Sequence, residues 1–297
     1  MYYSLFLLDN KHMNKAKLSL ITSMVIFGTV AIFRRNLDMS SSMISMLRGI
    51  IGATFLVIVT LSNKEQLIKP SNLKELVLII LAGALLGINW ILLFESYRYT
   101  SLATATLCYY MAPIFVIIFS IIFLKEKLTR TQIITMTIAL LGITLVSGIF
   151  DGGKIEGLKG ILFGLGAAVC YGLVVVTNRM TGNASATYKT IVQLSTTAII
   201  LLPYNFINHE FNNLILSTSN IILIIILGIL HTGIAYTIYF NAIKDVDGQS
   251  LAIYSYIDPI VTIILSTCLL HEAMSIYEII GMILILGATL YGELKAN

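Results

Sequence analysis

Residues 101–132 read SLATATLCYYMAPIFVIIFSIIFLKEKLTRTQ, an apolar run that is long enough to cross a bilayer. Pro113 lies near its middle, and the charged triplet Lys125-Glu126-Lys127 follows the apolar part. Residues 249–278 read QSLAIYSYIDPIVTIILSTCLLHEAMSIYE and repeat this pattern. A shift of 146 residues places Pro113 on Pro259 and Glu126 on Glu272. One predicted transmembrane unit is therefore used twice.

The composition predicts an all-α polytopic membrane protein. Of 297 residues, 57% are apolar and only 11% are charged, whereas about a quarter of the residues of a soluble domain carry a charge. A protein core cannot bury this many apolar residues, so lipid must cover much of the surface. A transmembrane β-barrel would alternate apolar and polar residues, and runs such as Leu76–Leu86 do not alternate.

We expect no metal, no cofactor and no nucleic-acid partner. Cys108, Cys170 and Cys268 lie in apolar runs without a CxxC or CxxH motif, and are interpreted as small buried hydrophobic residues. The formal charge of +4 is scattered over short loops, which indicates membrane topology rather than a nucleic-acid footprint. The first twelve residues lack a signal-peptide pattern, and Met13 is as good a start as Met1.

Ten membrane-spanning helices are predicted, each with the roughly 18–23 residues that a bilayer core of about 30 Å requires. Short connections rich in Gly, Pro, Asn and Asp separate them, and none is large enough for a soluble domain. The expected ranges are 17–34, 42–62, 74–96, 101–124, 130–149, 158–178, 188–206, 219–241, 248–270 and 275–292.

The distribution of basic residues predicts that both termini lie in the cytoplasm. With the N-terminus inside, the inner segments hold thirteen Lys and Arg residues and the outer segments hold five, which agrees with the positive-inside rule. The inner residues are Lys11, Lys15, Lys17, Lys64, Lys69, Lys74, Lys125, Lys127, Arg130, Arg179, Lys189, Lys244 and Lys295, and the outer ones are Arg34, Arg35, Arg98, Lys154 and Lys159.

The repeat extends to the first helix of each half. Gly28 and Gly172 each follow an aromatic residue, and the same shift that superposes them places Arg35 on Arg179. We therefore divide the chain into residues 1–149 and 150–297, each with five predicted helices. An odd number of helices makes the second half enter the membrane upside down. Such inverted repeats are typical of secondary transporters, whose binding site lies near the midplane between the halves.

At these residues the chain resembles the drug/metabolite transporter superfamily, specifically the ten-helix exporters with two EamA-type repeats. The resemblance rests on residues 100–105, the Tyr110-Met111-Ala112-Pro113 turn, residues 123–129, and Pro259, Glu272 and Gly287 in the second half. It implies that helices one to four and six to nine line a cavity and that helices five and ten support them from outside. Relatives are associated with amino acids, other metabolites, drugs and nucleotide sugars. Many members have Trp where this chain has Phe27, so an indole N–H donor is lost.

Two charged residues inside predicted helices are the main site candidates. Asp258 precedes Pro259 in the middle of helix nine, where a carboxylate costs about 2.5 kcal/mol or more unless it faces a cavity or a partner. It is either a site for a cargo ammonium or a proton, or a carboxylate bonded to a neighbouring helix. Arg48, in helix two, would pair with a cargo carboxylate or with Asp258; its alternative is a snorkelling or structurally paired arginine.

His231, in predicted helix eight, is a candidate for proton coupling with Asp258, because imidazole titrates near pH ~6.5. Its alternative is a hydrogen bond between helices. Pro113 and Pro259 are candidate hinges, since proline removes an amide and loosens the helix.

Aromatic and amide side chains complete the predicted cavity. Those near helix ends, such as Tyr97, are interpreted as part of the interfacial aromatic belt. Others flank the prolines at equivalent depth or lie inside predicted helices, where π-faces, hydroxyls and amides would contact cargo. The candidates are Tyr109, Tyr110, Tyr254, Tyr256, Trp90, Asn89 and Gln193. Glu126 and Glu272, by contrast, recur at the ends of the repeated helices and are interpreted as having a shared structural role.

These features predict a secondary transporter that moves a small organic solute, most simply an amino acid or related zwitterion, outward across the cytoplasmic membrane, with coupling to protons as a hypothesis. A multidrug or cation exporter is the alternative within the same class. An intramembrane enzyme and a passive sensor or scaffold are the alternatives from other classes; HExxH and GxSxG motifs are absent. The expected partners are the solute, the lipid bilayer and protons, with the oligomeric state left open between monomer and homodimer.

Overall fold

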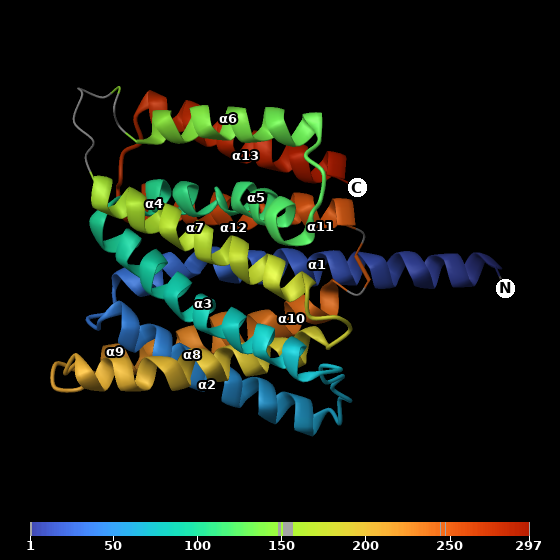
Figure 1. Cartoon of the computed structure of the whole chain (residues 1–297), viewed down its shortest axis with the longest axis horizontal. Helices are drawn as coiled ribbons and strands as arrows, with labels where there is room; N and C mark the ends of the chain where they lie inside the picture. Colours follow the sequence, from blue (N-terminus) through green and yellow to red (C-terminus); the bar gives the residue numbers. More distant parts are fainter. Residues whose placement is uncertain (1, 148–149, 151–156, 244, 247, 297) are drawn as a thin grey trace.

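The structure is a computed structural model that describes residues 2–147, 150, 157–243, 245–246 and 248–296. All regular secondary structure in these ranges is helical (Figure 1). The elements are α1 Tyr2–Arg35, α2 Ser41–Ser62, α3 Leu73–Tyr99, α4 Leu102–Tyr109, α5 Ala112–Leu124, α6 Arg130–Val146, α7 Leu158–Arg179, α8 Ala186–Ile207, α9 Thr218–Gly228, the π-helix η1 Ile229–Ile234, α10 Ala235–Ala242, α11 Gly248–Ser255, α12 Ile257–Leu269 and α13 Ile276–Ala296.

Eight helical stretches in the described part of the chain are long and apolar enough to cross a membrane, and two shorter apolar helices, Arg130–Val146 and Ile253–Leu269, accompany them. Large apolar side chains stand on the outside of the bundle, such as Leu61, which is 73% exposed, and Phe206, which is 74% exposed. A soluble monomer rarely exposes so much apolar surface. The prediction of a multi-pass helical membrane protein is confirmed.

Side-chain caps fix where several helices begin. Ser40, Asn72, Ser101 and Ser185 each accept a hydrogen bond from a backbone N–H in the first turn of the following helix. Thr129 and Gln132 form a reciprocal capping box at the start of α6. The polar connections between the apolar runs therefore set the helix starts, as local sequence rules predict.

Three of the helices predicted as continuous are interrupted. The fourth breaks at Tyr110 and Met111 into α4 and α5, and the ninth breaks at Tyr256 into α11 and α12. A shift of 146 residues places Tyr110 on Tyr256, and a proline follows each break within one turn. The eighth contains η1, where the hydrogen-bond ladder widens between α9 and α10.

The helices α6 and α13 pack against each other and lie to one side of the other helices (Figure 1). Their contact depends on glycine: a Cβ at Gly281 would lie 2.6 Å from the carbonyl oxygen of Gly142. The remaining helices form the main bundle, and the first part of α1 extends beyond it (Figure 1). This arrangement agrees with the supporting role expected for predicted helices five and ten.

Candidate functional site

A cavity of about 160 Å³ lies inside the main bundle, between residues of α1, α2, α3, α4, α7, α10 and α12. Among the described residues, its wall has one basic side chain, Arg48, and one acidic side chain, Asp258. The rest of its wall is mainly aromatic, so a bound molecule would meet two opposite charges and several π-faces. The aromatic residues are Phe27, Trp90, Tyr97, Tyr109, Tyr110, Tyr171 and Tyr236.

The guanidinium of Arg48 is held in place on two sides. Its Cζ lies 4.3 Å from the centre of the Trp90 ring, and its Nε donates to Oγ1 of Thr232 at 2.6 Å. The residue is only 5% exposed, yet it forms no ion pair with any described carboxylate. A buried charge without a counter-ion is costly, so an anionic group that enters the cavity would be strongly stabilised here.

The π-helix η1 presents Thr232 to Arg48. Its hydroxyl donates to the carbonyl oxygen of Leu227, five residues earlier, at 3.0 Å. The approach of α2 requires glycine, because a Cβ at Gly52 would lie 2.5 Å from Cγ2 of Thr232, and one at Gly228 would lie 2.5 Å from Cβ of Ile51. Single π-turns occur frequently at functional sites. This one holds the Thr232 hydroxyl within hydrogen-bond distance of Arg48.

Asp258 follows the break between α11 and α12 directly and reaches the same cavity. Its Oδ2 accepts a hydrogen bond of 3.1 Å from the hydroxyl of Tyr110, which lies at the counterpart break between α4 and α5. On the other side, a Cβ at Gly28 of α1 would lie 2.6 Å from the Asp258 carbonyl oxygen. No ion pair joins Asp258 to Arg48 or to any other described residue.

The structure brings together five of the predicted site residues, Arg48, Trp90, Tyr109, Tyr110 and Asp258. The other five do not line the cavity. They are His231, Asn89, Gln193, Tyr254 and Tyr256.

Both nitrogens of His231 have partners away from the cavity. Nε2 lies 2.8 Å from Oγ1 of Thr29, Nδ1 lies 3.3 Å from the carbonyl oxygen of Ile226, and the ring packs on Phe33. The side chain is fully buried, with 0% exposure. This environment matches the alternative that the sequence left open, a hydrogen bond between helices.

The two predicted amides also bind other helices rather than the cavity. Asn89 donates to the carbonyl oxygen of Ala167 at 2.7 Å, and Gln193 donates to Oδ1 of Asn178 at 2.6 Å. Tyr254 packs beside the cluster of Leu20, Met24 and Ala242, and Tyr256 is buried against Tyr110.

Several lining residues were missed by the sequence reasoning. Tyr97 was predicted to lie at the membrane interface, but this is wrong: it is only 6% exposed and lines the cavity, because α3 continues to Tyr99. Phe27 and Tyr171 precede the repeated residues Gly28 and Gly172. This repeat was visible in the sequence and would have indicated both aromatic residues.

A family model described as the EamA-like transporter family matches the chain twice, over residues 14–148 and 158–291. The chain belongs to this family. It thereby falls within the drug/metabolite transporter superfamily, and the resemblance expected from the sequence is confirmed.

Similar members of the EamA-like family are also described as transporters. The uncharacterized transporter YxxF of Bacillus subtilis (strain 168) is 27% identical over 94% of this chain and 89% of its own length. The uncharacterized transporter YvbV of the same organism is 24% identical over 80% of this chain and 78% of its own length. A protein of known crystal structure superposes with a TM-score of 0.63 at 21% identity, covering 94% of this chain and 98% of the other, and supports the fold.

Proposed function

We propose that this EamA-like transporter is a secondary transporter of the cell membrane that moves an amino acid or related zwitterion outward by alternating access. The observation that carries the proposal is the placement of Arg48 and Asp258 on one aromatic cavity, unpaired with each other. The outward direction follows the ten-helix exporters that the chain resembles.

The chemistry of the wall fits a zwitterion. Arg48 has its Nε on Thr232, which leaves its terminal N–H groups as donors for a carboxylate. Asp258 would accept an ammonium group, and the tyrosine and tryptophan rings would stabilise the same cation through their π-faces. A cavity of about 160 Å³ suits a small solute rather than a large one.

The membrane arrangement that we propose counts the two shorter apolar helices as crossings, which gives ten. Five fall in residues 1–149 and five in residues 150–297, and the two matches to the family model support this division. The excess of basic residues in the segments between them supports cytoplasmic termini. The end of the bundle that holds Arg35 then faces outward, and the end that holds Arg179 faces the cytoplasm.

In this mechanism one solute binds near the midplane, and rocking of the two inverted halves exposes it to each side in turn. The breaks at Tyr110 and Tyr256, with Pro113 and Pro259 just after them, would serve as hinges. We assign the coupling proton to Asp258, which lines the cavity, rather than to His231, whose ring nitrogens lie within hydrogen-bond distance of Thr29 and Ile226.

A multidrug or cation exporter is the second candidate, because Asp258 and the aromatic wall would also bind an organic cation. The two candidates differ in the role of Arg48, which repels a cation and attracts a carboxylate. A zwitterion needs both charges, whereas a cation needs only Asp258.

A thermal-shift screen of detergent-solubilised protein tests the proposal, using amino acids, nucleotide sugars and organic cations. A ligand at a hundred times its dissociation constant should stabilise the protein by about 2.7 kcal/mol. We expect an amino-acid hit that is lost in both Arg48→Gln and Asp258→Asn. The matched controls Arg130→Gln and Asp38→Asn change exposed charges and should keep the hit.

A hit that survives in Arg48→Gln but disappears in Asp258→Asn would favour the cation exporter instead. A hit that survives in both variants would refute the cavity as the binding site. Transport of the same ligand into liposomes that contain the purified protein, without chemical change to the ligand, would separate a transporter from an enzyme.

A further inference from the structure

Within the described part of the chain, two ion pairs join one half to the other. Arg35, the last residue of α1, binds Glu272 after α12, with 3.0 Å between Nη2 and Oε1. Arg179, the last residue of α7, binds Glu126 after α5. In each pair the arginine belongs to one half and the glutamate to the other. The repeat superposes arginine on arginine and glutamate on glutamate, so the two pairs are counterparts.

The turn that carries each glutamate is built in the same way. Lys125 and His271, which precede the glutamates, have φ angles of 56° and 55°. The amide of each glutamate donates to a serine carbonyl six residues earlier, to Ser120 at 3.3 Å and to Ser266 at 3.2 Å. Left-handed backbone at a residue other than glycine costs about 1–3 kcal/mol. The surroundings therefore impose this geometry twice, on two different residue types.

The same serines join the ion pairs through their hydroxyls. Ser120 Oγ accepts from Arg179 Nη1 at 2.9 Å, and Ser266 Oγ donates to the carboxylate of Glu272. We name the two groups the Arg35 cluster, made of Arg35, Glu272 and Ser266, and the Arg179 cluster, made of Arg179, Glu126 and Ser120.

The clusters lie at opposite ends of the bundle. The backbone N–H of Leu102, at the start of α4, donates to Glu272 Oε2 at 2.9 Å. Arg179 instead binds Ser120 near the end of α5. Since α4 and α5 together form one apolar stretch from Leu102 to Leu124, the clusters are separated by its length.

The Arg35 cluster holds more of the bundle together than its counterpart. Arg35 Nη1 also donates to the carbonyl oxygen of Tyr97 at 3.0 Å, so the cluster joins α1, α3, α4 and α12. Within the described residues, Arg179 and Glu126 bind only each other and Ser120. Their side chains are 47% and 41% exposed, against 38% and 15% for Arg35 and Glu272.

The groove at the Arg179 end is also larger than the pocket of about 240 Å³ beside Asp38 and Arg98 at the other end. This groove of about 690 Å³ runs past Glu126 and Arg179 to Tyr171, which lines the central cavity as well.

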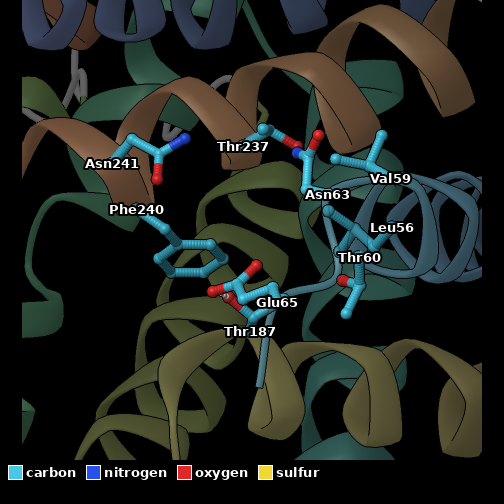
Figure 2. Close-up of a pocket in the computed structure, with 9 residues that line it drawn as sticks. All are labelled: Leu56, Val59, Thr60, Asn63, Glu65, Thr187, Thr237, Phe240 and Asn241. Atoms are coloured by element: carbon cyan, nitrogen blue, oxygen red, sulfur yellow. Dashed lines mark hydrogen bonds between the residues drawn. The ribbon is translucent and has the colours of Figure 1, made fainter. Parts of the chain in front are cut away.

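A second, small pocket of about 50 Å³ lies between the end of α2 and α10. Figure 2 shows Thr60 and Asn63 on one side of it and Phe240 on the other. Thr187 and Glu65 also line this pocket, and Thr187 donates to Glu65 at 3.5 Å.

We propose that the two clusters are latches that close the outer and inner ends of the transporter in turn. This inference rests on the alternating-access function proposed above. In this structure the Arg35 cluster is bonded to the α3–α4 connection, and in this proposal those bonds shut the central cavity from outside. Outward opening breaks the bonds from Arg35 and Glu272 to the α3–α4 connection, while the Arg179 cluster gains the corresponding contacts at the inner end.

Because the two latches have the same composition, the chain can keep its outward-open and inward-open states close in free energy. Both ion pairs are formed in this structure, so the contacts that alternate are the further bonds of each cluster, such as those from Arg35 and Glu272 to the α3–α4 connection. Because each end carries the same arginine, glutamate and serine, forming these bonds at one end returns much of the free energy lost at the other. A ligand shifts such an equilibrium only by its difference in affinity between the states. The free energies of the two states must therefore be similar if the binding of a metabolite is to drive the cycle.

The test measures access to the cavity from each side and needs no knowledge of the cargo. Thr106, a cavity-lining residue, is replaced by cysteine as a reporter in a protein whose three native cysteines have been removed. A charged thiol reagent that cannot cross membranes is added to intact cells for outer access and to inside-out vesicles for inner access. The ratio of the outer to the inner labelling rate is the readout.

Breaking the two latches should change this ratio in opposite directions. We expect Glu272→Gln to raise it and Glu126→Gln to lower it, each by about fivefold, which corresponds to about 1 kcal/mol. The combined exchange of Arg35→Glu with Glu272→Arg should return the ratio toward that of the parent. Arg98→Gln, which removes the ion pair with Glu95 inside α3, should leave it unchanged.

Loss of general stability would change both rates in the same direction, and that result, or an unchanged ratio, would overturn the proposal. If a glutamine variant does not fold, Arg35→Lys and Arg179→Lys keep the charge but lose the forked hydrogen bonding. They should shift the ratio in the same opposite directions, by smaller factors. Opposite shifts without solute transport in liposomes would refute the proposed function while leaving the latches in place.

Discussion

Arg48 on α2 and Asp258 on α12 line one cavity, and neither forms an ion pair with the other or with any other described residue. Each is held by a neutral group instead, Arg48 by Thr232 and Asp258 by Tyr110. Direct pairing would neutralise both charges and leave little electrostatic attraction for cargo. Their separation keeps both available, which is why the cavity is suited to a molecule with two charges.

Analogues of an amino-acid ligand should show which charge binds which group. We expect the wild-type protein to lose about 30-fold in affinity, roughly 2 kcal/mol, when the ligand carboxylate becomes an amide. In Arg48→Gln the acid and the amide should bind equally weakly. Isothermal titration of both ligands against both proteins measures this coupling. An Arg48→Gln protein that still prefers the acid would contradict the assignment.

The hydroxyl of Thr232 should position Arg48. In Thr232→Val the shape is kept but the acceptor for Nε is lost, and the affinity for a carboxylate ligand should fall about tenfold. Thr232→Ser keeps the hydroxyl and should restore most of the affinity. The amide analogue serves as the control, because its binding should change little in either variant. Equal losses in the serine and valine variants would indicate a packing role only.

Proton coupling should depend on Asp258 and not on His231. We expect the pH dependence of transport in liposomes to disappear in Asp258→Asn, because this carboxylate lines the cavity. His231→Asn should keep the pH dependence of the wild type, since the histidine lies between Thr29 and Ile226. Transport that loses its pH dependence only in the histidine variant would reverse the assignment.

The contact between α1 and α12 should not tolerate a side chain at Gly28. A Cβ there would lie 2.6 Å from the carbonyl oxygen of Asp258 and 2.7 Å from Cβ of Val261. We expect Gly28→Ala to destabilise the protein by about 1–3 kcal/mol in thermal unfolding in detergent. Gly287→Ala is the matched control, because beyond the adjacent backbone of its own helix no atom of the described residues lies within 4 Å of its added Cβ. The control should be at least as stable as the wild type, since alanine stabilises a helix by about 1 kcal/mol relative to glycine. If the two variants had the same melting temperature, the packing explanation would be excluded.

The sequence by itself determined the fold class, the approximate helix ranges and the internal repeat. Apolar runs of membrane length can only be helices or barrels, and the absence of alternation excludes barrels. Local caps such as Ser101 and Thr129 then set where helices start. Each of these signals depends on residues that are neighbours along the chain, so no tertiary contact was needed to find them.

Only the tertiary structure decided which polar residues share the cavity. His231 lies inside a predicted helix and Tyr97 lies just beyond the end of another, yet Tyr97 lines the cavity and His231 bonds Thr29 of α1, because packing sets the length and rotation of each helix. The π-turn that presents Thr232 likewise depends on close contact with α2. Two ion pairs join the halves of the chain, Arg35 with Glu272 and Arg179 with Glu126. The partners lie far apart in the sequence, so the sequence alone does not reveal these contacts. A charged residue can be identified from the sequence, but the residue with which it pairs is determined only when distant helices pack together.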